Sequence, residues 1–117
     1  MNKCILIGNL TKDPELTTTT NGVAVCRFSI AVKDGVDKDG ESLTQFIPCI
    51  AWNNLAEVIT DYVKKGDRIA IEGKINIQSY EDEEGENRKS FQIVVNKVHL
   101  VETKEESKDS KQNKRKR

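Results

Sequence analysis

One helical segment interrupts a series of strand-like segments, and this order constrains the fold more than any other feature. Residues 55–63 repeat apolar side chains at helical spacing, and Asn53 or Asn54 is suited to cap the helix start. Residues 64–66, Lys-Lys-Gly, are typical of a last helical turn followed by a terminating glycine. The expected apolar face consists of Leu55, Val58, Ile59, Tyr62 and Val63.

Five other segments have the length and apolar content of β-strands. They are residues 3–10, 23–33, 43–52, 67–80 and 89–101. The helix lies between the third and fourth strands, and residues 11–21 are predicted to be a polar connection. This order favours an all-β fold, the five-stranded Greek-key barrel called the OB-fold. The pattern alone is also compatible with other small barrels.

The charge distribution divides the chain into two parts. Residues 103–117 contain seven basic and three acidic residues and no apolar one, which predicts a disordered basic tail. Residues 1–102 then form one domain with four more acidic than basic residues. Many of these acids lie in two glycine-containing segments, 34–41 and 81–87, which are expected to be exposed turns. Acids confined to turns leave the other faces available for a polyanion.

Several classes of protein are not expected. No apolar run approaches the roughly 20 residues that cross a membrane, and the short run after Lys3 does not favour a signal peptide. The three cysteines fit neither a disulfide framework nor a zinc motif, so they are interpreted as small thiols in a reducing cytoplasm. One histidine, His99, offers no catalytic constellation. We expect no enzyme activity, no metal and no cofactor.

The six aromatic residues divide into two groups. Three are expected in the core: Phe28, Tyr62 and Phe91. Phe46 and Trp52 lie six residues apart on one strand and therefore share a face, roughly 20 Å apart. Tyr80 follows polar residues on its face of the fourth strand. An exposed ring binds a nucleic-acid base by stacking, with about 1–3 kcal/mol per base. Alternation does not show which face of residues 43–52 is inward.

Together the segments resemble the bacterial and phage single-stranded DNA-binding proteins, from about residue 1 to 101. The resemblance is carried by residues 2–10, Asp13-Pro14-Glu15, Asn21-Gly22, Leu55-Ala56-Glu57, Lys64-Lys65-Gly66 and Ile71-Glu72-Gly73-Lys74. It implies an OB-fold that binds single-stranded DNA independently of sequence. Such a protein coats and protects single strands in DNA replication, recombination or repair, in the cytoplasm of a bacterium or a phage-infected host. The family's usual state is a homotetramer built partly by pairing first strands, and a dimer is the second choice.

The resemblance also assigns site residues. It implies base stacking on Phe46, Trp52 and Tyr80, and it places a further family aromatic near Val36, where this chain has none. Lys3, Lys64 and Lys65 match basic positions of the family. Four more residues are predicted to contact phosphates in place of basic positions that are neutral here: Lys33, Lys74, Arg88 and Lys89.

The tail departs from the family pattern, since this sequence ends in Lys114-Arg115-Lys116-Arg117 without an acidic tip. Recruitment of partner enzymes through such a tip is therefore not expected, and a phage or mobile element is the more natural source. Two alternative functions stay open. One is a primosomal or replication accessory factor with an OB-fold, and the other is a protein-interaction module with weak DNA binding.

Overall fold

The structure, a computed structural model, describes residues 1–103. In chain order its elements are β1 (Cys4–Leu10), β2 (Glu15–Thr18), β3 (Ala24–Val36), β4 (Ser42–Trp52), α1 (Asn53–Tyr62), β5 (Arg68–Glu81) and β6 (Asn87–Glu102). The five predicted strands and the helix are present in the predicted order. Residues 104–117, which hold nearly all of the predicted tail, lie outside the described residues.

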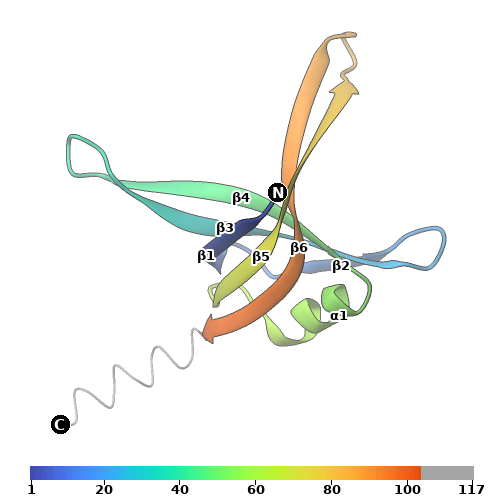
Figure 1. The fold of residues 1–117 in the computed structure, drawn as a ribbon, viewed down its shortest axis with the longest axis horizontal. Coiled ribbons are helices and arrows are strands. Elements are labelled where there is room, and N and C mark those ends of the chain that lie inside the picture. Colours follow the sequence, from blue (N-terminus) through green and yellow to red (C-terminus); the bar gives the residue numbers. More distant parts are fainter. Residues whose placement is uncertain (104–117) are drawn as a thin grey trace.

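Five strands close into a barrel in the order β1-β5-β6-β4-β3, and β1 returns to pair with β3 (Figure 1). The neighbouring strands are antiparallel except β4 and β6, which are parallel. This arrangement confirms the predicted all-β OB-fold. The short strand β2 lies outside the ring and pairs with β3. It was not predicted, because its four residues, Glu15–Thr18, are exposed and carry little apolar signal.

The two long hairpins extend well beyond the barrel. We call residues 32–45 the β3–β4 arm and residues 74–92 the β5–β6 arm; Figure 1 shows them projecting in different directions. By contrast, the ring is completed by two short joins. β1 meets β3 at two paired positions, and β4 meets β6 at two paired positions. The barrel is therefore two long hairpins and one strand, joined at narrow seams.

The core fills the barrel, and α1 closes one end of it. The helix contributes Ala56 and Ile59, and the residue after its end, Val63, is also buried. Burying a side chain of this size stabilises the fold by roughly 1.5–3 kcal/mol. The core cluster consists of Leu10, Cys26, Phe28, Ile30, Cys49, Ala51, Ala56, Ile59, Val63, Ile69, Ile71, Ile93 and Val95.

The predicted apolar face of α1 is partly wrong. Val58 and Tyr62 are 48% and 71% exposed, so neither is in the core. The apolar residues of this segment are spread over two neighbouring faces of the helix, and only the face with Ile59 and Val63 is turned to the barrel. The buried face includes Ala56, whose small side chain lets the helix approach the barrel closely.

The predicted helix ends also differ from the structure. Trp52, and not Asn53 or Asn54, occupies the N-cap position, and its side chain makes no capping hydrogen bond. The helix begins at Asn53, whose φ is 60°. Residues 64–65 follow the helix rather than forming its last turn. The chain turns away there because the Asp67 carboxylate accepts the Lys64 N–H at 2.9 Å, and Gly66 adopts a φ of 90°.

All three cysteines are free thiols, as expected. Cys26 and Cys49 are buried and Cys4 is half-buried. Burial raises the pKa of the Cys49 thiol to about 12. That thiol therefore stays protonated at neutral pH and packs as a small apolar side chain.

Candidate nucleic-acid interface

The outward side of β4 carries two of the three predicted rings. Side chains alternate along a strand, and Cys49 and Ala51 point into the core with exposed fractions of 3% and 0%. The other set lies on the opposite side and includes Phe46 and Trp52, which are 65% and 41% exposed, and Ile50, which is 2% exposed but is not part of the core cluster. Alternation alone left the inward face of this strand open, and the core cluster, which contains Cys49 and Ala51, now identifies it.

Strand register places Tyr80 on the same side of the sheet. Ile50, on the outward side of β4, is paired with Val94 of β6. Two-residue steps along β6 lead from Val94 to Arg88, whose partner on β5 is Tyr80. Tyr80 is 52% exposed. The three rings therefore share one surface, which we call the aromatic face: the outward side of β3, β4 and the β5–β6 arm.

Three unpaired cations lie on the aromatic face. Arg27 and Lys33 belong to β3, where their register partners on β4 are Ile50 and Thr44. Lys74 lies on β5, opposite Val94. None of the three forms an ion pair within residues 1–103. They are available to neutralise phosphates beside the rings.

Arg88, opposite Tyr80, is already engaged within its own arm. Its Nε donates to an Asp82 carboxylate oxygen at 2.9 Å, and its Nη2 lies 3.6 Å from Oε2 of Glu86. The hydrogen bond from Arg88 and those from backbone N–H groups lower the pKa of the Asp82 carboxyl. Arg88 must leave Asp82, or share it, to contact a phosphate.

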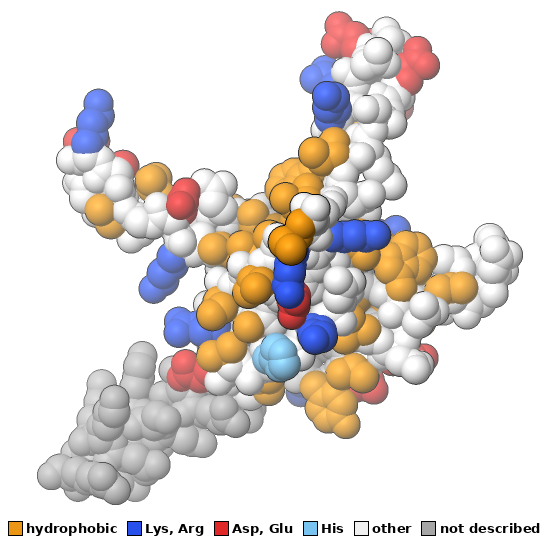
Figure 2. Space-filling view, viewed as in Figure 1, with side chains coloured by type: hydrophobic (Ala, Val, Ile, Leu, Met, Phe, Trp, Pro, Cys, Tyr) orange, Lys and Arg blue, Asp and Glu red, His pale blue; other side chains and the backbone are white. Residues whose placement is uncertain are grey.

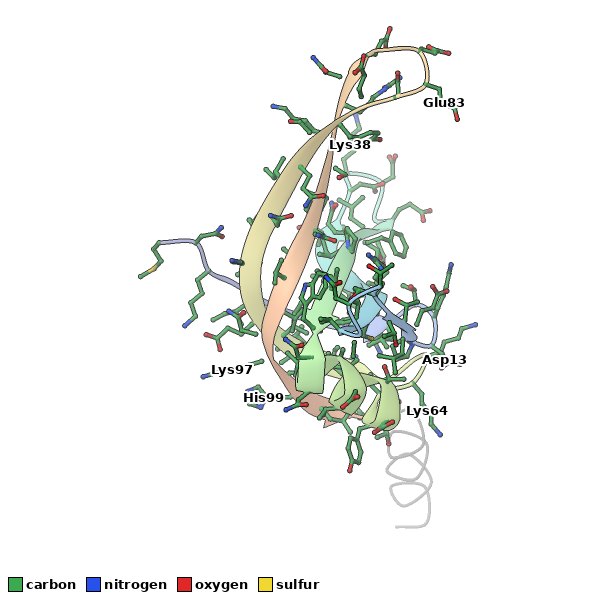
Figure 3. The ribbon with its side chains drawn as sticks, turned by 90° about the vertical axis from the view of Figure 1, so that its right-hand side faces the viewer. Asp13, Lys38, Lys64, Glu83, Lys97 and His99 are labelled. Atoms are coloured by element: carbon green, nitrogen blue, oxygen red, sulfur yellow. The ribbon has the colours of Figure 1, made fainter. Side chains whose placement is uncertain are left out.

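The other predicted cations are not on the aromatic face. Lys89 pairs with Ser79, on the opposite side of the β5–β6 arm from Tyr80. Lys3 forms an ion pair with Glu72, and its hydrogen bond lowers the pKa of that carboxyl. Lys64 and Lys65 follow the helix, and Figure 3 shows Lys64 at the far end of the barrel from the arm tips.

Both arm tips are acidic. The β3–β4 arm ends in the segment 37–41 and the β5–β6 arm in the segment 82–86, each with three acidic residues or more. Acidic side chains gather at the upper tip in Figure 2. A bound polyanion is repelled from these tips, so the attractive part of the aromatic face ends near Tyr80 on one arm and before Asp34 on the other.

Sequence reasoning missed several residues of this region. Arg27 was assigned no role, although alternation against buried Cys26 and Phe28 would have placed it outward. Phe91 was predicted to be in the core but is 46% exposed. It lies on the side of β6 that carries buried Ile93, at a point where the arm has already left the barrel.

Two other kinds of feature were sought among the described residues, a metal site and a membrane-spanning helix. Within residues 1–103, no group of three or more His, Cys, Asp or Glu side chains could hold a metal ion. No helix in that range is long and apolar enough to cross a membrane.

Comparison with known proteins gives consistent matches. A profile of the single-strand binding protein family matches residues 1–101. A "Single-stranded DNA-binding protein" of Clostridium tetani is 42% identical over 103 residues, covering 87% of this chain and 71% of the relative. "Single-stranded DNA-binding protein 2" of Clostridium acetobutylicum is 40% identical over 103 residues, covering 87% and 77%.

A third relative, a "Single-stranded DNA-binding protein" of Oceanobacillus iheyensis, is 36% identical over 105 residues, covering 89% of this chain and 65% of the relative. This chain therefore spans about two thirds of the length of such relatives. The match covers the whole barrel and both arms. The chain belongs to the single-strand binding protein family.

Proposed function

We propose that this protein binds single-stranded DNA independently of sequence, and that it coats and protects single strands during replication, recombination or repair. The observation that carries the proposal is the shared orientation of Phe46, Trp52 and Tyr80 on the aromatic face. Every base has a π-face, so stacking on three exposed rings tolerates any sequence. The names of the relatives and the family match support the same function.

The mechanism is stacking assisted by phosphate neutralisation. Lys33, Lys74 and Arg88 lie nearest the rings among the cations that the sequence predicted for phosphate contact, and Arg27 adds a fourth. Lys3, Lys64 and Lys65 would act only if the strand wraps around the barrel, and Lys89 only if the strand also contacts the other side of the β5–β6 arm. No catalytic step is required, and the protein acts as a binding protein.

Trp52 provides the direct test because it is the only tryptophan. Titration with oligo-dT should quench its fluorescence and saturate at a fixed number of nucleotides per chain. Absence of quenching at low salt would contradict stacking on Trp52. Cooperative coverage of long poly-dT would favour a coating protein over a replication accessory factor or an interaction module.

We further propose that the protein assembles as a homotetramer by pairing β1 strands, with a dimer as the alternative. Within the described residues, the edge of β1 that faces away from β5 is paired only at Asn9 and Leu10. Exposed edges of this kind pair readily with another chain. Light scattering should give a mass near four times 13.2 kDa, and a mass of one chain would contradict the assembly.

The remaining parts of the proposal concern the tail and the cell. The division at residue 102 and the disordered basic tail stay predictions, because residues 104–117 lie outside the described residues. A cytoplasmic location follows from a role on DNA in a bacterium or an infected bacterial host. Recruitment of enzymes through an acidic tip is not part of the proposed function.

A further inference from the structure

Two buried residues on the aromatic face do not belong to the core of the barrel. Val25 of β3 and Ile50 of β4 are 1% and 2% exposed, yet neither is part of the core cluster. We propose that they are positioning residues for DNA binding, because they form an apolar support that holds the Trp52 ring in place for a base. We call this pair the Trp52 support. The inference rests on the proposed function and concerns how one of its three rings is prepared.

Strand register places both residues next to Trp52. Val25 is the direct partner of Trp52 across the β3–β4 pair, and opposed side chains on one side of a sheet have Cβ atoms about 4.5–5.5 Å apart. Ile50 precedes Trp52 by two residues on β4, so its side chain lies on the same side. The ring therefore has an aliphatic neighbour in two directions, across the strand pair and along its own strand.

The opposite side of the two strands makes the contacts with the core and the helix. Cys26 and Ala51 are a register pair, both are 0% exposed, and both belong to the core cluster. The hydroxyl of Thr60 in α1 lies 3.5 Å from the Cys26 sulfur, so the helix is on that side of the sheet. The helix cannot cover the Trp52 support. The burial of the support therefore comes from side chains on the aromatic face itself.

Trp52 is the side chain best able to provide this cover. The other residues paired with the support are a short polar residue, a long cation and a valine: Thr17, Arg27 and Val94. The first two are exposed, and the third is half-buried. Trp52 has the largest apolar surface of these neighbours, and its ring is the least exposed of the three, at 41% against 65% and 52%. More than half of the Trp52 surface is therefore covered by protein.

Apolar contact is what orients this ring. Within residues 1–103 the Trp52 side chain forms no hydrogen bond or ion pair. Phe46 lacks a comparable support, because its partner across the strand pair is Ala31. A side chain that is already ordered avoids the entropy cost of being immobilised when a ligand binds. Trp52 therefore offers a base a fixed surface, whereas Phe46 has to be ordered as the strand binds.

The test is a double-mutant cycle between Val25→Ala and Trp52→Ala. Binding is measured from the anisotropy of a fluorescein-labelled oligo-dT, which also reports on proteins that lack the tryptophan. Val63→Ala is the matched control, since Val63 is 2% exposed, belongs to the core cluster and lies away from the aromatic face. The decay of tryptophan fluorescence anisotropy in the free proteins measures the motion of the Trp52 ring itself.

We expect Val25→Ala to bind oligo-dT about 2- to 10-fold more weakly than wild type, with faster local motion of the Trp52 ring. In the Trp52→Ala background the same change should alter the affinity by less than about twofold. Val63→Ala should lower the midpoint of urea unfolding, as Val25→Ala does, because each removes buried methyl groups. It should nevertheless keep the affinity and the ring motion of wild type.

Equal losses of affinity with and without Trp52 would overturn the inference, because Val25 would then act through the fold as a whole. Unchanged affinity and ring motion in Val25→Ala would also overturn it, yet leave the proposed function intact. Absence of oligo-dT binding by the wild-type protein would overturn both. If Val25→Ala fails to fold by circular dichroism, Ile50→Val removes only a single methyl group from the support and is used in the same cycle.

Discussion

The two arms have nearly the same tip but different surfaces. In the β3–β4 arm, Asp37 accepts the N–H groups of Asp39 and Glu41, both at 2.9 Å. In the β5–β6 arm, Asp82 accepts the N–H groups of residues 84 and 86 at 3.0 and 2.9 Å. Each turn also has a glycine with positive φ, at 82° and 80°. The two hairpin turns therefore have the same pattern of hydrogen bonds and the same glycine conformation.

The difference lies in what the outward sides carry. The β5–β6 arm presents Tyr80 beside Arg88, whereas the corresponding part of the β3–β4 arm presents Val36 opposite Ser42. Under the proposed function, the β5–β6 arm therefore offers a base a stacking surface near its tip and the β3–β4 arm does not. The hydrogen bonds of the turns form both arms, and we expect the residues on the outward sides to decide which arm contacts DNA.

The largest expected effect concerns the base of the β5–β6 arm. A Cβ atom on Gly73 would lie 2.2 Å from the Val94 carbonyl oxygen, next to the register shift between β5 and β6. Gly73→Ala must push the strands apart and should destabilise the fold by about 3 kcal/mol or more. Urea unfolding followed by circular dichroism measures this.

Gly40→Ala at the other tip is the control for that variant. A Cβ atom there meets no atom within 4 Å, so the cost is only that of the left-handed backbone, about 1–2 kcal/mol. Equal stabilities of the two variants would contradict the close approach of β6 to β5 at Gly73.

The second prediction separates the two sides of the β5–β6 arm. Tyr80→Ala should weaken oligo-dT binding by about 1–3 kcal/mol, or roughly 5- to 150-fold, because one stacking surface is lost. Phe91→Ala removes a ring of similar exposure, 46% against 52%, on the opposite side of the same arm. Its affinity should stay within about twofold of wild type. Equal losses in the Trp52 quenching titration would contradict the assigned side.

The third prediction concerns a variant that adds an aromatic ring to the β3–β4 arm. Val36 is 65% exposed and lies on the outward side, because its partner Ser42 is four residues from Phe46 along β4. Val36→Trp should tighten binding by about 1 kcal/mol, with a longer covered length of oligo-dT. A second tryptophan complicates quenching, so isothermal titration calorimetry is the measurement. Unchanged affinity and covered length would show that acidic repulsion at this tip outweighs stacking.

The smallest effect concerns the ion pair at the β5–β6 tip. Because its folded pKa is lowered, chiefly by the hydrogen bond from Arg88, ionised Asp82 stabilises the turn at neutral pH. This stabilisation is lost as pH falls from the ordinary value of 3.8 through the lowered folded value. Carboxyl resonances in an NMR titration report the pKa directly.

Two changes should raise that pKa. Arg88→Gln removes the main cause, while Lys89→Gln, the matched control on the other side, should leave it unchanged. Saturating oligo-dT should also raise it if Arg88 leaves Asp82 for a phosphate. A value in the complex equal to that of the free protein would mean that Arg88 stays with Asp82.

The strand order and the position of the helix could be predicted from the sequence because apolar alternation and turn residues mark them. β2 could not, since its stability comes from pairing with β3 and not from its own apolar residues. Tyr62 and Phe91 were misplaced for a similar reason. Local spacing shows which residues share a face, but only the packing of the barrel shows whether that face is covered.

The three candidate rings were identified from alternation and from the family resemblance, yet their common surface depends on two pairs of residues between β4 and β6. Pairing between distant segments leaves no local pattern in the sequence. Lys33, Lys74, Arg88 and Lys89 were selected by charge without knowledge of the strand register, which explains why Lys89, on the other side of the arm from Tyr80, was included.

The narrow seams also have a consequence for the order of folding. Each long hairpin closes a short loop, whereas the seams join Asn9 to Ala31 and Cys49 to Ile93 across far more chain. Loop-closure entropy favours the short loops, so we expect both hairpins before either seam. Substitutions at the seams should then speed unfolding and leave the refolding rate nearly unchanged. The aromatic face, which joins β4 to the β5–β6 arm across the β4–β6 seam, would be among the last surfaces to appear as the chain folds.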